Sequence, residues 1–320
     1  LKLFEDEITS FPMFPIAEIF EEVSNKSGFN SQEAKRILLT FLFELVLEQR
    51  PEELVWIYYF CVLRTDVHWQ QINNGIGEEI LLKAVANATG RNTSSIRNEY
   101  KEKGCLGLIL QDSKSQQNTL VSFIVKSNNI QENKNEAITL GWIFENIKQL
   151  GQITGDKSQN IKESILVKIF RSCSAIESKY ICNFFSGNFK IGVGERILQI
   201  SLVRAFASYW IRHGHDSGIN SNNEEDIFNH WEFNIQKLLT RFPDAGTVIS
   251  TLLKTYSLPK TLLICDLEPG IPCKPMLAKP TKSLDQVFDR LEGLSFTCEF
   301  KYDGLRGQIH YSRKDKFLNL

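Results

Sequence analysis

The sequence lacks an apolar run long enough to cross a membrane. Its best candidate, from Ile37 to Val46, is interrupted by Thr40 and Glu44 and falls short of the roughly 18 apolar residues that a spanning helix requires. We therefore expect a protein that does not associate with membranes.

No two of the seven cysteines are spaced as C-x-x-C, which excludes the commonest structural zinc motif. The odd and scattered set favours free thiols in a reducing compartment, most of them in the core. The chain also begins at Leu1 without an initiator methionine or a basic-then-apolar leader. From this we expect part of a longer polypeptide that has no secretory signal.

The composition that is present is ordinary for a globular protein. Apolar residues make up 42% and charged residues 23%, which excludes a disordered or collagen-like chain. The length of 320 residues is twice that of a typical domain of roughly 150 residues, so we expect at least two structural units.

The net charge of −1 argues against a protein that coats nucleic acid, but the charge is unevenly distributed. Residues 1–60 carry five basic and eleven acidic residues, whereas residues 148–212 carry ten basic and four acidic residues. The second segment, with a balance of +6, is either a set of solvated helical faces or a surface that binds phosphate groups.

Helical periodicity dominates the chain up to Ser257. Apolar residues recur at intervals of three and four, which predicts amphipathic helices that pack on a common core. Three such stripes are Ala34, Ile37, Leu38, Phe41, Leu42, Leu45 and Val46; Ile161, Ile165, Leu166, Ile169, Phe170 and Cys173; and Val203, Phe206, Ala207, Trp210 and Ile211. No internal repeat is evident.

Prolines mark a boundary after Ser257. Five of the nine prolines follow this residue, and such a run favours a stiff, extended connection. We therefore predict a helical domain over residues 1–257, a proline-rich linker over 258–280 and the start of a second domain over 281–320.

The second domain is expected to begin with a helix and continue with a hairpin. A capping box between Ser283 and Gln286 predicts a short helix with its apolar side inward. From Ser295 to Tyr311 apolar and polar residues alternate, with an interruption at Asp303-Gly304 that predicts the hairpin turn.

Lys301 lies in this hairpin and has the setting of a nucleophile. The period of two puts Glu299 and Lys301 on the same face of the first strand, and Arg306 returns on the second. A lysine amine becomes reactive when neighbouring cations or partial burial favour its neutral form. On its own, however, a Lys-x-Asp-Gly turn is more often an ordinary exposed hairpin.

A glycine-rich block, S-G-N-F-K-I-G-V-G-E, lies within the cationic segment. Gly187, Gly192 and Gly194 permit close approach of the backbone, and a helix that starts near Gly194 offers unpaired N–H groups to a phosphate. Lys190 and Arg196 add positive charge. The alternative is a glycine-rich turn between two helices that binds nothing.

Four strings together resemble the ATP-dependent DNA ligases, in the order that this family shows. C-E-F-K-Y-D-G-L-R-G-Q-I-H (298–310) resembles the adenylation motif, and P-G-I-P-C-K-P-M-L-A-K-P-T (269–281) resembles the segment before it. G-I-G-E-E-I-L-L-K-A-V-A-N-A-T-G (75–90) and F-S-G-N-F-K-I-G-V-G-E (185–195) resemble signatures of the helical DNA-binding domain in the replicative eukaryotic branch.

The resemblance implies a mainly α fold: a helical DNA-binding domain followed by the first α/β elements of a nucleotidyltransferase (adenylation) domain. It implies that Lys301 attacks ATP to form a lysine-AMP, that Glu299 binds the adenine and Arg306 the ribose side, and that Mg²⁺ neutralises the phosphates. The AMP would pass to the 5′-phosphate of a nick in duplex DNA, and the 3′-hydroxyl would displace it and seal the strand.

The resemblance also implies a set of contacts to the DNA backbone, with little readout of bases. These candidates are Gly187, Lys190, Ile191, Gly192, Gly194, Arg196 and, more weakly, Lys83. No metal ligand is assigned, and Asp303 is expected to fix the turn. The family further implies action in DNA replication, repair and recombination in the nucleus, with an organellar form as the alternative, and a sliding-clamp partner bound through a region outside this chain.

Two other functions compete with a DNA ligase. An RNA-capping or RNA-ligating nucleotidyltransferase shares the Lys-x-Asp-Gly nucleophile but lacks the long helical domain before it. A non-catalytic helical DNA-binding module would make the hairpin a vestige. We also expect this chain alone to form little lysine-AMP, because the later motifs of the family are not in it.

Overall fold

The computed structural model describes residues 10–64, 75–128, 137–215, 218, 223–275, 280–300, 302, 304, 307–312 and 317–319, with the backbone alone for 118–128 and 317–319. Helices dominate this part of the chain, and the predicted mainly α fold is confirmed. They are α1 (Met13–Asn25), α2 (Ser31–Gln49), η1 (Pro51–Glu53), α3 (Leu54–Cys61), α4 (Glu78–Thr89), α5 (Thr93–Lys103), α6 (Leu106–Asn128), α7 (Leu140–Gln152), α8 (Ser158–Ser172), α9 (Ala175–Phe185), α10 (Glu195–His213), α11 (Glu224–Arg241), α12 (Ala245–Thr255), α13 (Leu258–Ile264) and α14 (Leu284–Arg290). The strands β1 (His310–Ser312) and β2 (Phe317–Asn319) pair antiparallel.

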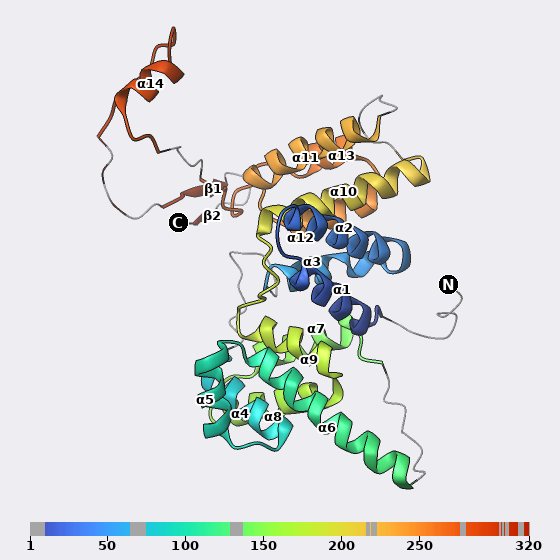
Figure 1. The fold of residues 1–320 in the computed structure, drawn as a ribbon. Helices are drawn as coiled ribbons and strands as arrows, with labels where there is room; N and C mark the ends of the chain where they lie inside the picture. The colour runs from blue at the N-terminus through green and yellow to red at the C-terminus, as the bar shows by residue number, and fades with distance from the viewer. Residues whose placement is uncertain are drawn as a thin grey trace.

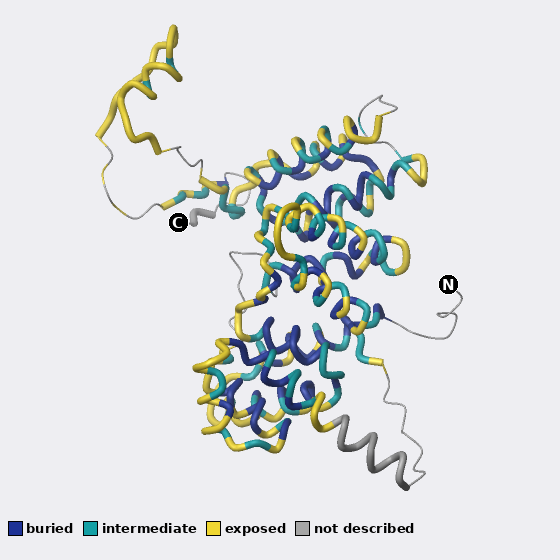
Figure 2. Tube along the Cα trace, in the orientation of Figure 1, coloured by how far each residue is buried: buried dark blue, intermediate teal, exposed yellow. Residues whose placement is uncertain are grey.

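The helices form two groups with a middle layer between them (Figure 1). One group contains α2, α3, α10, α11, α12 and α13, the other contains α4, α5, α6 and α8, and α1, α7 and α9 lie between. Helix α2 packs along α10, α4 along α8 and α6 along α9, while α1 contacts both α2 and α9. Buried residues line the facing sides of these helices (Figure 2), so the core runs through both groups.

The middle layer reveals an internal repeat that sequence analysis did not find. The N–H of Met13 donates to the carbonyl of Ile138 at 2.8 Å, and the N–H of Leu140 donates to the carbonyl of Phe11 at 2.8 Å. Met13 and Leu140 are the first residues of α1 and α7, two helices of equal length. These reciprocal bonds join the starts of two corresponding halves, α1 to α4 and α7 to α10, in which α2 packs on α10 as α8 packs on α4.

An aromatic cluster fills the core between α1, α3 and α9. The ring of Phe60 stacks on Phe184 at 4.8 Å and meets Phe189 edge-on at 5.6 Å, and Phe20 packs against Phe189 at 4.7 Å and Tyr180 at 5.4 Å. Such pairs add to the stabilisation that burial of the rings provides. The cluster therefore fixes the chain that enters and leaves α9.

Helix α2 buries a different face from the predicted one. Its buried residues are Lys35, Leu39, Leu42, Phe43, Val46 and Leu47. Ile37 and Phe41, which were expected in the core, are exposed. Apolar side chains occur on nearly all sides of this helix, so the spacing fits two stripes, and packing against α1 and α10 selects one of them. The other two predicted stripes are buried or half-buried except for Ile161.

Helix α13 corrects the start of the predicted linker. Leu258–Ile264 form a helix rather than an extended chain, because the hydroxyl of Ser257 accepts a hydrogen bond from the N–H of Lys260 at 3.5 Å. Pro259 stands in the first turn, where a helix needs no donor. The division into domains stays a prediction.

The hairpin predicted between Ser295 and Tyr311 is wrong for the described residues. Residues 295–300 form no strand, and β1 pairs with β2 in the register His310 with Asn319. The cap at Ser283 is confirmed, since its hydroxyl accepts from the N–H of Gln286 at 3.4 Å, but α14 buries no side chain. An amphipathic strand or helix is stable only when another layer covers its apolar face. Phe300 is 89% exposed, so the described residues do not supply such a layer.

The cysteines behave largely as predicted. All seven are free thiols, and five of them are buried, with Cys298 exposed. Burial raises the pKa of Cys173 to about 12 and also raises the pKa of Cys61 and Cys182, so these thiols stay protonated and unreactive. Within the described ranges, no helix combines the length and the low polarity that crossing a membrane demands.

We expect Phe60→Ala to lower the free energy of unfolding by about 3–5 kcal/mol, because it empties the centre of the aromatic cluster. Urea-induced unfolding followed by circular dichroism measures this loss. Phe233 on α11 is 67% exposed, so Phe233→Ala serves as the matched control and should cost less than about 0.5 kcal/mol. Equal losses for the two variants would contradict the assignment of the core.

Candidate nucleic-acid interface

The glycine block joins α9 to α10 and contains three residues with positive φ. Gly187, Lys190 and Gly192 have φ values of 68°, 55° and 65°. Glycine adopts this region without steric cost, whereas lysine does so only when its surroundings hold it there. The N–H of Gly187 donates to the carbonyl of Phe184 at 3.1 Å and closes the first turn after α9.

Apolar side chains anchor the block to the core. Phe189 and Ile191 are 6% and 3% exposed, and the ring of Phe189 belongs to the aromatic cluster through Phe20. Lys190 and Gly192, which alternate with them, are exposed. The buried side chain of Ile191 anchors the block, and the contact with DNA predicted for this residue stays a prediction.

A buried lysine from α2 supports the same turn. The ammonium of Lys35 donates to the carbonyls of Ile191 at 3.0 Å and Gly192 at 3.3 Å, and the residue is only 7% exposed. A Cβ atom at position 192 would lie 2.7 Å from this ammonium nitrogen. Both the positive φ and this contact therefore favour glycine at position 192.

The turn leads directly into the N-terminus of α10. Gly194 caps the helix without a side chain, and its carbonyl accepts the N–H of Ile197 at 3.0 Å and of Leu198 at 3.3 Å. In the described part of the chain, the N–H groups of Glu195 and Arg196 have no acceptor. These groups carry the positive end of the helix dipole, which favours an anion such as phosphate.

The predicted basic residues of the interface are exposed. The ammonium of Lys190 donates a hydrogen bond to the carbonyl of Gly104 at the end of α5, which connects the block to the group of helices that contains α5. Arg196 has no ion pair among the described residues. Lys83 is exposed on α4, and α4 also begins with a glycine turn.

This second turn repeats the backbone geometry of the first. Gly75 has a φ of 59°, and Gly77 caps α4 with φ −87° and ψ 167°. In the block, Gly192 has a φ of 65° and Gly194 caps α10 with φ −87° and ψ 163°. Sequence analysis assigned no site residue to this turn. The shared string G-[IV]-G-E-x-I-L is the signal that could have found it.

A second buried lysine stands behind the second turn. Lys162 of α8 is 7% exposed, as Lys35 is, and its ammonium nitrogen would lie 2.8 Å from a Cβ atom at Gly75. Each lysine is the last residue of a string S-Q-x-x-K at the start of its helix. Both helices start after a residue with left-handed backbone, Asn30 or Lys157. The fold thus builds the same lysine-backed glycine turn twice.

An open depression lies beside the first turn. It has a volume of about 410 Å³ and is lined by Gly187 to Val193 together with the end of α3. Backbone and apolar atoms line it more than charged side chains do. This shape suits a sugar-phosphate chain passing over the turn better than an enclosed small molecule.

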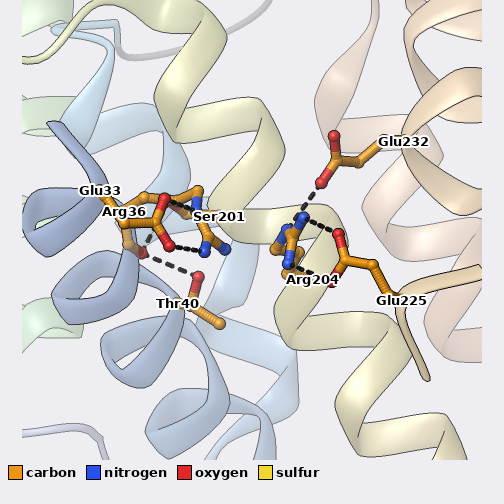
Figure 3. A network of polar contacts seen from close by, with 7 residues as sticks. All are labelled: Glu33, Arg36, Thr40, Ser201, Arg204, Glu225 and Glu232. Carbon is orange, nitrogen blue, oxygen red and sulfur yellow. Dashed lines mark hydrogen bonds and ion pairs between the residues drawn. The ribbon is translucent and has the colours of Figure 1, made fainter. Parts of the chain in front are cut away.

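Ion pairs neutralise part of the +6 balance of residues 148–212. Three of its basic residues bind glutamates outside the segment: Lys179 with Glu21 (2.6 Å), Arg204 with Glu225 (3.0 Å) and Glu232 (2.7 Å), and Arg212 with Glu44 (3.2 Å) and Glu48 (3.0 Å). Figure 3 shows Arg204 between its two partners, near the hydrogen bond from Ser201 to the carbonyl of Arg36 that joins α10 to α2. The linear charge balance therefore overstates the positive surface.

The residues predicted to handle the nucleotide are mostly not described. Lys301, Asp303 and Arg306 lie outside the described residues. Glu299 is exposed and is not part of a strand. Among the described side chains, no group of three or more His, Cys, Asp or Glu could hold a metal ion. The roles of these residues stay predictions.

Comparison with known proteins gives the geometry its context. Residues 13–203 match the family described as the DNA ligase N terminus, and residues 275–319 match the ATP dependent DNA ligase domain. The first match contains both glycine turns.

Individual relatives agree with these matches. The chain is 29% identical to DNA ligase 1 of Schizosaccharomyces pombe, over 94% of this chain and 37% of the relative. It is 30% identical to DNA ligase 1 of Dictyostelium discoideum, over 93% and 24%, and 29% identical to DNA ligase 1 of Saccharomyces cerevisiae, over 94% and 38%. The chain thus spans between about a quarter and two fifths of the length of these relatives.

Gly192→Ala should destabilise the protein more than Gly187→Ala. Both glycines have nearly the same positive φ, so each alanine costs about 1–2 kcal/mol of backbone strain. At 192 the methyl group also displaces the Lys35 ammonium from its acceptors, which adds about 1–3 kcal/mol, whereas nothing lies within 4 Å of the new methyl at 187. Chemical denaturation measures both, and equal losses would show that Lys35 does not support the turn.

Proposed function

Because the chain belongs to the ATP-dependent DNA ligase family, we propose that its helical part binds the backbone of nicked duplex DNA and that the protein seals nicks with ATP. The observation that carries the DNA-binding half of this proposal is the repeated glycine turn. Each copy presents a helix N-terminus, is backed by a buried lysine and is held by the core.

Phosphate is the part of DNA that these turns suit. Their donors are backbone N–H groups and lysine or arginine side chains, which bind phosphate oxygens without distinguishing bases. An enzyme that repairs nicks anywhere must tolerate every sequence. We therefore propose Gly187, Lys190, Gly192, Gly194 and Arg196 as contacts of the first turn.

The second turn supplies further contacts of the same kind. Gly75 and Gly77 shape its backbone, and Lys83 of α4 is an exposed cation on the helix that follows. We propose that these three residues bind the DNA backbone at a second point. Two such points, fixed by one core, would set the orientation of the duplex.

The chemistry is proposed to start at Lys301. Its neutral amine attacks the α-phosphate of ATP, so that an N–P bond forms, the bond to pyrophosphate breaks and the amine loses a proton. Glu299 accepts a hydrogen bond from the adenine amino group, and Arg306 contacts the ribose side. The AMP passes to the 5′-phosphate at the nick, and the 3′-hydroxyl displaces it.

Mg²⁺ would neutralise the phosphates during these transfers. The described residues do not form a set of ligands that fits this ion. We propose that the protein acts in DNA replication, repair and recombination in the nucleus, as the eukaryotic relatives named DNA ligase 1 suggest. A sliding-clamp partner stays a prediction.

We expect this chain to bind nicked duplex DNA with little sequence preference and a steep salt dependence. Arg196→Ala should weaken binding to all sequences alike and lower the slope of log K against log salt by about 0.9, because one phosphate contact is lost. Lys190→Ala should act in the same direction. Fluorescence anisotropy at several salt concentrations measures both effects.

Lys254→Ala is the control for this experiment, since Lys254 is exposed on α12 and no described contact joins it to either turn. It removes the same charge from the protein. If it lowered the slope as much as Arg196→Ala does, the effect would come from overall charge, and the first turn would not be the interface.

We expect Lys301 to be the site of adenylation, although this chain alone should form little lysine-AMP. The reason is that Phe300 and Tyr302 on either side of it are 89% and 87% exposed, so the described residues do not enclose a nucleotide. Transfer of labelled AMP from ATP is measured on this chain and on a chimera extended with the rest of the S. pombe relative.

Lys301→Ala accompanies each protein in this assay. Strong labelling of the chimera that disappears with Lys301→Ala supports the assignment. Labelling that persists in the variant would exclude Lys301 as the nucleophile, and strong labelling of the short chain would show that it already forms a working nucleotide site.

A further inference from the structure

The first residue of α10 carries a negative charge where the proposed phosphate would bind. The carboxylate of Glu195 accepts a hydrogen bond from Gln199 at 3.1 Å and lies 3.5 Å from Arg64 and 3.3 Å from Lys274. Its side chain is about one third exposed, so solvent and ions reach the site. The helix N-terminus and the two cations together form the surroundings that an anion requires.

The corresponding residue of the second turn differs. Glu78 is the first residue of α4, as Glu195 is of α10, but it is exposed and has no ion pair among the described residues. The repeat therefore supplies an internal comparison. A carboxylate at the start of the helix is common to both turns, whereas the pair of cations is specific to the first.

The cations come from two segments that are distant in the sequence. Arg64 follows α3, and Lys274 lies in the connection after α13, where its N–H donates to the carbonyl of Thr240 at 3.0 Å. Both side chains are partly exposed, Arg64 at 21% and Lys274 at 43%. Neither is buried deeply enough to be held by the core, so each can exchange one anionic partner for another.

The connection that holds Lys274 is also bound to β1. The side chain of Gln308 accepts from the N–H of Cys273 at 3.0 Å and donates to the carbonyl of Cys273 at 2.6 Å. His310 accepts from the N–H of Gly270 at 3.1 Å through Nδ1. A continuous series of contacts therefore runs from the start of α10, through Lys274, to the strand that follows the adenylation motif.

A DNA phosphate and the Glu195 carboxylate require the same donors. If a phosphate approaches the N-terminus of α10, its charge repels Glu195 and attracts Arg64 and Lys274. Before DNA binds, those cations are already paired, so part of their attraction for DNA is lost. The carboxylate acts as a substitute for phosphate in the free protein.

We propose that Glu195 is an intramolecular competitor of the DNA phosphate, which holds Arg64 and Lys274 in the free protein and releases them to DNA. This inference rests on the proposed DNA-binding function and adds Arg64 and Lys274 to its contacts.

Glu195→Gln tests the proposal, because glutamine keeps the size and the helix but releases the cations. Binding of nicked duplex to the chain should become tighter by roughly three- to tenfold at low salt, with a steeper salt dependence. In combination with Lys274→Ala and Arg64→Ala, this gain should disappear. Fluorescence anisotropy measures affinity, and thermal unfolding verifies that each variant is folded.

Glu78→Gln is the matched control, since it removes the same charge at the equivalent helix position without releasing a cation. Any gain from Glu78→Gln should persist when Lys274 and Arg64 are replaced. A gain from Glu195→Gln that also persists there would overturn the proposal, because it would reflect reduced repulsion alone. An unchanged affinity in Glu195→Gln would overturn it as well.

These outcomes are distinguishable from a failure of the proposed function. If the wild-type chain does not bind DNA, or if Arg196→Ala has no effect, the DNA-binding site itself is wrong. If Arg196→Ala weakens binding while the effects of Glu195→Gln and Lys274→Ala on the free energy of DNA binding add up, the DNA-binding site stands and only the competition is excluded.

Discussion

The geometry of the proposed interface depends on a buried ammonium group. A lysine side chain is rarely buried unless acceptors surround its charge, and in this fold the carbonyls of a helix-entry turn accept from Lys35. With the ammonium there, a Cβ atom at position 192 would lie 2.7 Å from it, and the positive φ of Gly192 favours glycine for a second reason. The turn then directs the first N–H groups of α10 away from the core. One contact thus connects burial, backbone conformation and the donors that face a ligand.

The repeat makes each turn depend on both halves of the helical part. Lys35 belongs to the first half of the repeat and Gly192 to the second, whereas Lys162 belongs to the second half and Gly75 to the first. Each turn is therefore completed by the opposite half, and neither half contains both parts of its own turn. Helix pairs α2 with α10 and α4 with α8 follow the same exchange. The two turns are consequently held by one shared core.

The helical class and the glycine block could be predicted because both signals are local in the sequence. The support of the block could not, since Lys35 lies 156 residues from Ile191 and a lysine in an amphipathic helix is normally solvated. The repeat escaped notice because its matching strings, G-[IV]-G-E and S-Q-x-x-K, are short and its partners cross between halves. Linear charge sums failed for a related reason: Glu21, Glu44 and Glu48 of the first 60 residues pair with basic residues far along the chain. The adenylation motif was found by its resemblance alone, and its alternating pattern predicted a hairpin that packing does not support here.

A pair of turns held by one core places a condition on any duplex that binds both. Backbone donors cannot distinguish bases, but they can distinguish spacing, because phosphates of a duplex recur at fixed intervals that a deformed or single strand does not keep. Selectivity for duplex DNA would then arise from the core that separates the turns rather than from the residues that touch the phosphates. A substitution such as Gly192→Ala would disturb recognition without removing a charged side chain that is proposed to contact phosphate, because it shifts one point of attachment relative to the other. If Glu195 competes with phosphate as proposed, it acts on a turn whose position the core determines, so charge would adjust affinity while packing would determine which nucleic acid fits.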